Sequence, residues 1–290
     1  MNFEKLPPAL IASLRKQYAE NNYYESPLAA NNYFYIFPSS NGLFFPNEHD
    51  SFKEIVVEKN KFEWRSIISE INLNADYIFL RDIHKQWYLR GINTKINSIA
   101  SIVDFIKSKT NGRKIRAVGS SSGGFLSTII GLELGAEYVL SFSGQFQLTA
   151  TAKDDPVENP WVVGSSDNIY FSLEHLFLKN ISTPVFYFVG DKSITDIPDL
   201  KFARRFRNIY TFILDSEVHG VPFAPFVLKY LLLKNVDELV ALHERFDGRV
   251  VAPAELGVFL CGRRKYIEEL IAWKAKSLKK KVVSVLKFKK

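Results

Sequence analysis

Short, almost continuously apolar segments alternate with helical segments in this 290-residue chain, and this alternation restricts its fold more than any other feature. The segments 96–106, 125–134 and 199–206 favour helices, the first because isoleucine and valine recur there at helical spacing. Seven segments read as strands because they are rich in aromatic and β-branched residues: 33–37, 55–57, 75–82, 114–119, 137–144, 183–191 and 208–215. Strands that are apolar on both faces need cover on both faces. The pattern therefore predicts an α/β protein with a mostly parallel central sheet and helices on both faces.

The same pattern divides the chain into three parts. We expect a core at 31–235, an N-terminal extension at 1–30 and a C-terminal helical segment at 236–290. Within the core, the irregular stretch at 145–180 contains Pro156, Pro160 and Gly164, which indicates a lid-like insertion.

Cysteine content and N-terminal composition narrow the class of protein. Cys261 is the only cysteine, so a disulfide scaffold, a CxxC redox pair and a cysteine-rich zinc site are excluded, and we expect no metal. The first residues lack the pattern of a signal peptide, since Pro7 and Pro8 interrupt their apolar stretch. No run of 18 apolar residues is present. These features predict a cytoplasmic protein.

The segment 117–125 reads AVGSSSGGF and places a G-x-S-x-G pattern between a predicted strand and a predicted helix. A serine on such a tight turn projects above the sheet edge, and glycine neighbours let the chain pass closely. Ser121 is therefore the candidate nucleophile, and the backbone N–H of Ser122 is the first candidate oxyanion donor. A dinucleotide fingerprint would need glycine at 121 and a phosphate loop would need lysine at 125, which leaves a plain tight turn as the alternative.

His219 is the candidate general base because it follows the last predicted strand, in the loop DSEVHG. An α/β-hydrolase triad runs in the order serine, acid, histidine, and this order disfavours the histidines that precede the acid loop, which are His49, His84 and His175. His243 lies in a helical stretch, where a packing or surface role is expected. The alternative for His219 itself is a solvated loop histidine.

The acid of the triad is expected in the loop GDKSITD, which follows the strand 183–191. Asp191 directly follows Gly190 and leaves room for a helix and a strand before His219, so the sequence slightly favours Asp191 as the acid. Asp196 is the second candidate, and its alternative role is to cap the helix that follows it. The acid would orient His219 and stabilise its imidazolium form.

A second oxyanion donor is expected in the loop RDIHKQWYLRG, which follows the strand 75–82. Trp87 and Tyr88 could lend a backbone N–H there and wall a pocket, and aromatic faces suit the flat apolar surfaces of sugar rings. The alternative is that both rings belong to the core, where aromatic side chains bury large areas.

Taken together, the GSSSGG turn, the acid loop and the VHG loop resemble the α/β-hydrolase superfamily over residues 30–235. The loop with Trp87 and Tyr88, followed by this turn, is similar to a bacterial branch that includes capsule-polymer O-acetyltransferases and acetyltransferase-like accessory secretion proteins. The resemblance implies Ser121 as nucleophile, His219 as base and Asp191 or Asp196 as acid. The acid loop departs from the common glycine-x-x-aspartate spacing, because Ser193 occupies the place of the aspartate.

The C-terminal tail carries the basic character of the chain. The net charge is +7, and the last twenty residues hold eight lysines and no acid, so the remainder has a net charge of −1. Apolar residues fall near one helical face of this tail, a pattern typical of helices that lie on an anionic membrane surface. We expect a peripheral contact with the inner face of a membrane, or with an anionic glycan, while the alternative is a solvated helix packed on the body. Nucleic acid is not expected as a partner, since no recognised motif accompanies the charge.

These observations predict a serine-nucleophile acyl-transfer enzyme, either an O-acetyltransferase or an esterase, that acts on an acyl ester of a carbohydrate. The branch resemblance favours a bacterial surface polysaccharide as substrate and acetyl-CoA as acyl donor, with no bound cofactor. The alternative is a non-catalytic accessory protein that uses the same scaffold in a glycan-assembly or export complex.

Overall fold

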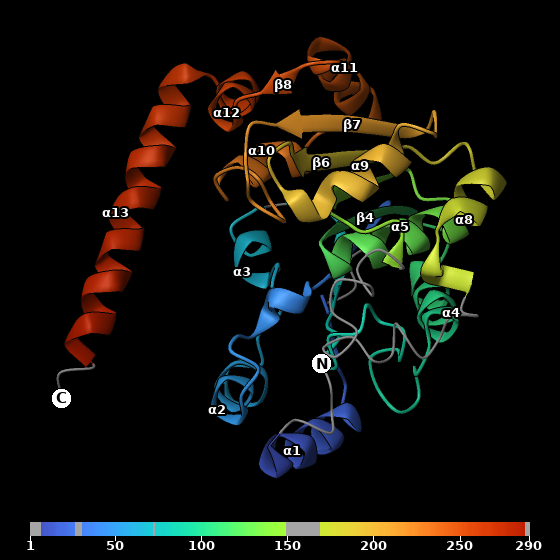
Figure 1. The fold of residues 1–290 in the computed structure, drawn as a ribbon, viewed down its shortest axis with the longest axis vertical. Coiled ribbons are helices and arrows are strands. Elements are labelled where there is room, and N and C mark those ends of the chain that lie inside the picture. Colours follow the sequence, from blue (N-terminus) through green and yellow to red (C-terminus); the bar gives the residue numbers. More distant parts are fainter. Residues whose placement is uncertain (1–6, 27–30, 72, 149–168, 288–290) are drawn as a thin grey trace.

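The computed structural model describes residues 7–26, 31–71, 73–148 and 169–287, and the side chains of its last helix as far as residue 278. In these ranges eight strands form one sheet in the order β1-β3-β2-β4-β5-β6-β7-β8 (Figure 1). The pairing of β1 with β3 is antiparallel and all other pairings are parallel. The strands are β1 (Tyr23–Glu25), β2 (Tyr33–Pro38), β3 (Asp76–Leu80), β4 (Lys114–Ser120), β5 (Tyr138–Phe142), β6 (Val185–Gly190), β7 (Ile209–Leu214) and β8 (Val250–Val251).

Helices cover both faces of the sheet, as the sequence predicts. One face packs against α4 (Ile99–Thr110), α5 (Ser122–Leu134), α8 (Glu174–Lys179) and α9 (Ile197–Ala203). The other packs against α3 (Arg65–Ile68), α10 (Val227–Leu232), α11 (Val236–Phe246), α12 (Pro253–Cys261) and α13 (Arg263–Lys287). The prediction of an α/β fold with a mostly parallel sheet is confirmed.

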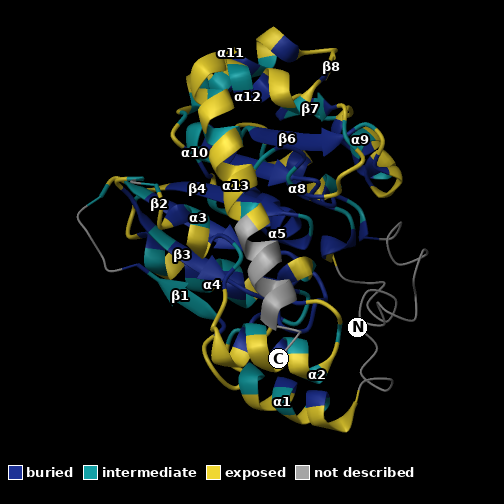
Figure 2. Ribbon diagram, turned by 90° about the vertical axis from the view of Figure 1, so that its left-hand side faces the viewer, coloured by how far each residue is buried: buried dark blue, intermediate teal, exposed yellow. Residues whose placement is uncertain are grey.

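Alternate residues of each strand enter the two cores, because successive side chains of a strand point to opposite faces. In β2, Ile36 belongs to the core under α5, while Tyr35 and Phe37 belong to the core under α10 and α11. The second core is strongly aromatic, and the rings of Phe188 and Phe212 stack across β6 and β7 with centroids 4.4 Å apart. Figure 2 shows the central strands as a buried band between partly exposed helices, whereas the edge strand β1 is only partly buried.

The sheet extends beyond both ends of the predicted core. The strand β1 lies within the expected extension 1–30, yet it pairs with β3 and forms an edge of the sheet. At the other end, β8 pairs with β7, and Leu239, Leu242 and Leu256 pack into the second core. Both core boundaries are therefore corrected, because short edge strands carry too little apolar pattern to be recognised in sequence.

The segment 55–57, predicted as a strand, lies instead in a π-helical turn that spans Lys53–Glu58. It follows α2 (His49–Phe52), and Val56 and Phe52 pack with Leu10 and Leu14 of α1 (Pro8–Tyr18) in a third apolar cluster. Packing on one helical face has overridden the β-propensity of isoleucine and valine. Of the predicted insertion 145–180, residues 149–168 lie outside the described ranges, and 169–179 contain a 3-10 turn (Ile169–Phe171) and α8, both packed on the first core.

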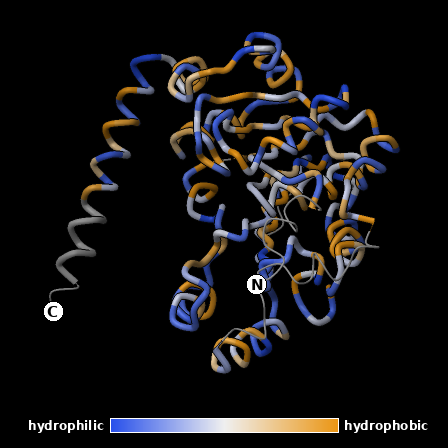
Figure 3. Tube along the Cα trace, viewed as in Figure 1, coloured by the Kyte–Doolittle hydropathy of each residue, from blue (hydrophilic) through white to orange (hydrophobic). Residues whose placement is uncertain are grey.

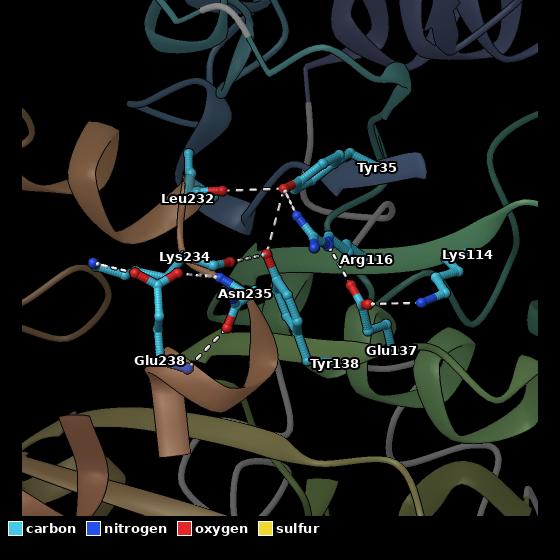
Figure 4. Close-up of polar contacts among 9 residues, drawn as sticks. All are labelled: Tyr35, Lys114, Arg116, Glu137, Tyr138, Leu232, Lys234, Asn235 and Glu238. Atoms are coloured by element: carbon cyan, nitrogen blue, oxygen red, sulfur yellow. Dashed lines mark hydrogen bonds and ion pairs between the residues drawn. The ribbon is translucent and has the colours of Figure 1, made fainter. Parts of the chain in front are cut away.

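A buried polar network ties the amino-terminal ends of the central strands to the helices of the second face (Figure 4). Arg116 of β4 donates hydrogen bonds to the Tyr35 hydroxyl at 2.7 Å and to Glu137 at 2.6 Å. The Tyr35 hydroxyl donates in turn to the carbonyl oxygen of Leu232 at the end of α10. This network holds the end of the sheet at which the central strands begin, which is opposite to the carboxyl ends of the strands.

The helix α13 runs along one side of the molecule (Figure 1), and its described part mixes hydrophilic and hydrophobic residues along its length (Figure 3). Lys276 forms an ion pair with Glu70, which ties the helix to the segment after α3. In this helix, the apolar residues Ile271 and Leu278 are each 64% exposed. Among the described residues, no helix combines the length and the apolar character that crossing a bilayer would require.

Candidate active site

Ser121 occupies the turn between β4 and α5 at the carboxyl edge of the sheet. Its backbone has φ +52° and ψ −124°, a conformation that costs energy for a residue with a Cβ and that clusters at functional sites. Two backbone hydrogen bonds hold it there: its N–H donates to the carbonyl of Phe142 at 2.8 Å, and its own carbonyl accepts from Phe125 at 2.9 Å. The serine is thus placed at the first turn of α5, where unpaired N–H groups and the helix dipole favour negative charge.

The glycines around Ser121 are required by close packing of the backbone. A Cβ on Gly119 would lie 2.2 Å from the carbonyl oxygen of Gly123. A Cβ on Gly123 would lie 2.4 Å from the carbonyl oxygen of Pro38, at the end of β2. The G-x-S-x-G pattern is therefore explained by the approach of α5 to β4 and to β2, which a plain turn would not need.

His219 lies between Ser121 and Asp196. Its Nε2 is 2.8 Å from the Ser121 hydroxyl oxygen, and its Nδ1 is 2.6 Å from Oδ1 of Asp196. A carboxylate accepts only, so Nδ1 carries the proton and Nε2 is left as the acceptor for the serine hydroxyl. The His219 side chain is 36% exposed, which leaves it accessible to a substrate.

The structure brings Asp196, and not Asp191, to the histidine. The Asp196 side chain is 2% exposed and makes no capping hydrogen bond to the helix α9 that follows it. The partly exposed Asp191 instead accepts a hydrogen bond from the backbone N–H of Ser216 at 3.1 Å. The preference for Asp191 as the acid, drawn from the sequence, is therefore corrected. A 3-10 turn (Ile194–Asp196) brings the chain from the end of β6 to a position beside His219.

The loop beside the Ser121 turn comes from β2, because β2 is the neighbour of β4 in the sheet and β3 lies one strand further out. The hydroxyl of Ser122 donates to the side-chain oxygen of Asn41 in this loop at 2.9 Å. The sequence predicts a second oxyanion donor in the loop after β3, but the N–H of Tyr88 is already used and cannot serve as that donor. Its N–H donates to the buried Asp82 at 2.9 Å, and its fully buried ring directs the hydroxyl to the carbonyl of Ser39 at 2.7 Å.

Trp87 is also mostly buried, with 6% of its surface exposed, so the core alternative holds for both rings. Its indole nevertheless reaches the site, since Nε1–H donates to Oε1 of Gln145 at 3.0 Å. The amide nitrogen of Gln145 lies 3.4 Å from Nε2 of His219. Sequence reasoning missed Gln145, although its position just after the strand 137–144 could have signalled a residue at the carboxyl edge of the sheet.

Two carboxyl groups, those of the half-buried Glu63 and the buried Asp199, support the loops around the site, and neither was anticipated from sequence. Glu63 accepts hydrogen bonds from the backbone N–H and the hydroxyl of Ser40, in the loop after β2, and burial raises the pKa of its carboxyl. Asp199 of α9 accepts from the N–H groups of Phe146 and Gln147, at 2.6 and 3.2 Å. Burial, together with the nearby Asp196, raises the pKa of Asp199 to about 7.

Two of the remaining histidines, His84 and His243, pack against aromatic rings. His84 lies beneath the ring of Tyr18, with centroids 4.3 Å apart, and burial lowers its pKa to about 3. His243 packs edge-on against the rings of Tyr210 and Phe212. Among the described residues, no cluster of three or more histidine, cysteine or acidic side chains could hold a metal ion.

A mostly parallel sheet covered on both faces, a serine on a strained strand-to-helix turn, and an acid and a histidine on later loops define an α/β-hydrolase fold. No protein-family model matches the chain, and no curated protein matches it.

Several solved structures resemble the chain at low identity. A Staphylococcus aureus protein of unknown function is 14% identical, with a TM-score of 0.48 over 76% of this chain and 94% of that one. The capsule O-acetyltransferase of Neisseria meningitidis serogroup A is 15% identical, with a TM-score of 0.45 over 77% and 88% of the two chains. Est1E from Butyrivibrio proteoclasticus is 13% identical, with a TM-score of 0.47 over 76% and 94%. At these values the likeness assigns neither an activity nor a substrate.

Proposed function

We propose that this protein is a serine-nucleophile acyl-transfer enzyme that acts on an acyl ester of a carbohydrate, which an O-acetyltransferase forms and an esterase cleaves. The observation that carries the proposal is the position of His219, within hydrogen-bond distance of both Ser121 and Asp196. A nucleophile paired with a base that a third group orients is the arrangement that covalent acyl transfer requires.

In the first half of the reaction, the Ser121 oxygen attacks the acyl carbon while Nε2 of His219 accepts the hydroxyl proton. Asp196 holds the other ring nitrogen and stabilises the imidazolium that forms. The negative charge on the acyl oxygen is stabilised by the N–H of Ser122 at the start of α5 and by a donor from the loop after β2. His219 then returns its proton to the leaving group, and the acyl group remains on Ser121.

In the second half, water or an alcohol attacks the acyl-enzyme, which gives hydrolysis or transfer respectively. The favoured acceptor is a hydroxyl of a bacterial surface polysaccharide, with acetyl-CoA as the donor. This finer assignment is supported by the resemblance of the loop with Trp87 and Tyr88 to the polysaccharide-acetylating branch.

The test of the acyl-transfer chemistry is labelling with a fluorophosphonate probe. We expect the wild-type protein to be labelled and the variants Ser121→Ala and His219→Ala to lose labelling. Ser127→Ala is a matched control on α5, since the buried hydroxyl of Ser127 has no hydrogen-bond partner among the described residues; it should be labelled like the wild type. A folded wild-type protein that is not labelled would favour the alternative, a non-catalytic accessory protein.

The substrate class needs a separate measurement. Purified protein is incubated with acetyl-CoA and a de-acetylated capsule polymer, and O-acetylation is followed by mass spectrometry. Acetylated polymer supports the transferase. Efficient hydrolysis of small esters without any acetylated polymer would reject transfer to the glycan and leave an esterase.

A further inference from the structure

The side chain of Gln145 joins the indole of Trp87 to the imidazole of His219. Its Oε1 accepts the indole N–H at 3.0 Å, and its Nε2 lies 3.4 Å from both Nε2 of His219 and the carbonyl oxygen of Ser143. Gln145 is 6% exposed, and the His219 ring nitrogen that it approaches is the one that contacts the Ser121 hydroxyl.

The orientation of the Gln145 amide is determined by its partners. An indole N–H can only donate, so the atom that faces Trp87 must be the amide oxygen. The NH2 group therefore faces His219, and the carbonyl of Ser143, which can only accept, agrees with this assignment. A hydrogen-bond donor is thereby directed at the space around Nε2 of His219.

The backbone around Gln145 is also held in place. The N–H groups of the next two residues, Phe146 and Gln147, donate to the buried carboxyl of Asp199. On the other side, the hydroxyl of Ser143 donates to the carbonyl of Gly220, directly after the histidine. Hydrogen bonds thus hold the backbone on both sides of Gln145 as well as its side-chain amide. Such a donor loses little conformational freedom when it binds a reacting group, which is what preorganisation requires.

We propose that Gln145 holds the acceptor hydroxyl during the second half of the reaction, an inference that rests on the acyl-transfer function proposed above. In the resting protein, the Ser121 hydroxyl donates to Nε2 of His219. Once Ser121 carries the acyl group, its oxygen has no proton to donate, and the hydroxyl of water or of an alcohol takes its place at Nε2. An oxygen in that place lies within reach of the Gln145 amide, which donates to a lone pair of the acceptor.

The reaction then proceeds without any proton exchange at Gln145. The acceptor O–H gives its proton to Nε2 of His219 as the acceptor oxygen bonds to the acyl carbon. The bond between that carbon and the Ser121 oxygen breaks, and His219 returns the proton to Ser121. Gln145 only positions the acceptor hydroxyl. Trp87 is a positioning residue that acts by orienting the Gln145 amide.

The experiment separates the two halves of the reaction. Protein is acylated with p-nitrophenyl acetate, whose phenolate leaves without help from an acid, and first-turnover release of p-nitrophenol gives the acylation rate. Excess ester is then removed, and the loss of the acetyl adduct is followed by mass spectrometry. We expect Gln145→Met to slow the loss of the adduct about tenfold, the effect of one hydrogen bond, with acylation changed less than about twofold.

Two further variants test the role of the indole and the specificity of the effect. Trp87→Phe keeps an aromatic ring but removes the N–H, so it should slow the same step severalfold while leaving acylation unchanged. Gln147→Met places the same substitution two residues further on and should behave like the wild type.

The possible failures are distinguishable. If the wild type forms no acetyl adduct on Ser121, the proposed function is wrong and this proposal fails with it. If the adduct forms and Gln145→Met slows both steps equally, Gln145 merely supports His219 and the proposal is overturned. If Gln145→Met loses the adduct at the same rate as the wild type, the proposal is overturned as well.

Discussion

The carboxyl group of Asp199 should make the stability of this protein depend on pH. Asp199 is buried, with 4% of its surface exposed, and Asp196 lies nearby, so burial and the second carboxyl group raise the pKa of Asp199 from 3.8 to about 7. Between these values the folded protein keeps the proton and the unfolded chain loses it. The contribution of Asp199 to stability is thus fully present below pH 3.8 and is lost as the pH rises to about 7.

The size of this effect follows from the two pKa values. Their difference corresponds to at most about 4 kcal/mol of unfolding free energy between pH 4 and pH 8. Asp199→Asn removes the titration but keeps an oxygen that can accept from the N–H groups of Phe146 and Gln147. We therefore expect the stability of Asp199→Asn relative to the wild type to rise with pH over this range.

Guanidinium unfolding of both proteins at pH 5 and pH 8 measures the change. Asp199→Ala serves as the control, because it removes both the titratable group and the acceptor and should be destabilised at pH 5, where Asp199→Asn is not. Parallel stability curves for the wild type and Asp199→Asn across pH would refute the reasoning, since Asp199 would then titrate alike in the folded and unfolded states.

Three further outcomes can be checked with single variants. Asp196→Asn should lower the esterase kcat by about 10³-fold to 10⁴-fold, whereas Asp191→Asn should change it less than about twofold; equal losses would contradict the assignment of the acid. Gly123→Ala should lower the unfolding free energy by about 1–3 kcal/mol in a denaturant titration, because its Cβ would meet the carbonyl of Pro38 at 2.4 Å, and an unchanged midpoint would contradict that clash. Deletion of 271–290 should abolish co-sedimentation with phosphatidylserine vesicles at low salt, and retained sedimentation would show that the lysines there are not the contact.

The sequence predicts those parts of the molecule that depend on local pattern. The buried parallel strands have a continuous apolar run, and Ser121 and His219 stand at the turns that the triad order requires. The edge strands β1 and β8 have no such pattern, because an edge strand of two or three residues buries little. The helical form of the turn at 55–57 could not be predicted for a different reason. It depends on packing against α1, which is far away in sequence.

Within the site, the missed residues are those that depend on the order of strands in the sheet. The placement of β2 beside β4 brings Asn41 to Ser122, and nothing in the local sequence states which strand is the neighbour. The choice between Asp191 and Asp196 depends on how far a five-residue stretch of loop turns back, which also requires tertiary contacts. Gln145 is recognisable only once Trp87 is known to lie against it.

The distribution of the site along the chain has a consequence for synthesis on the ribosome. The serine and its histidine are 98 residues apart in sequence, with β5, β6 and β7 between them. A nascent chain that has emerged only as far as α5 contains Ser121 but lacks Phe142, whose carbonyl holds the serine turn, and it lacks the histidine that would act as base. The arrangement of serine, acid and histidine is therefore complete only after β7 and the loop that carries His219 have joined the growing sheet.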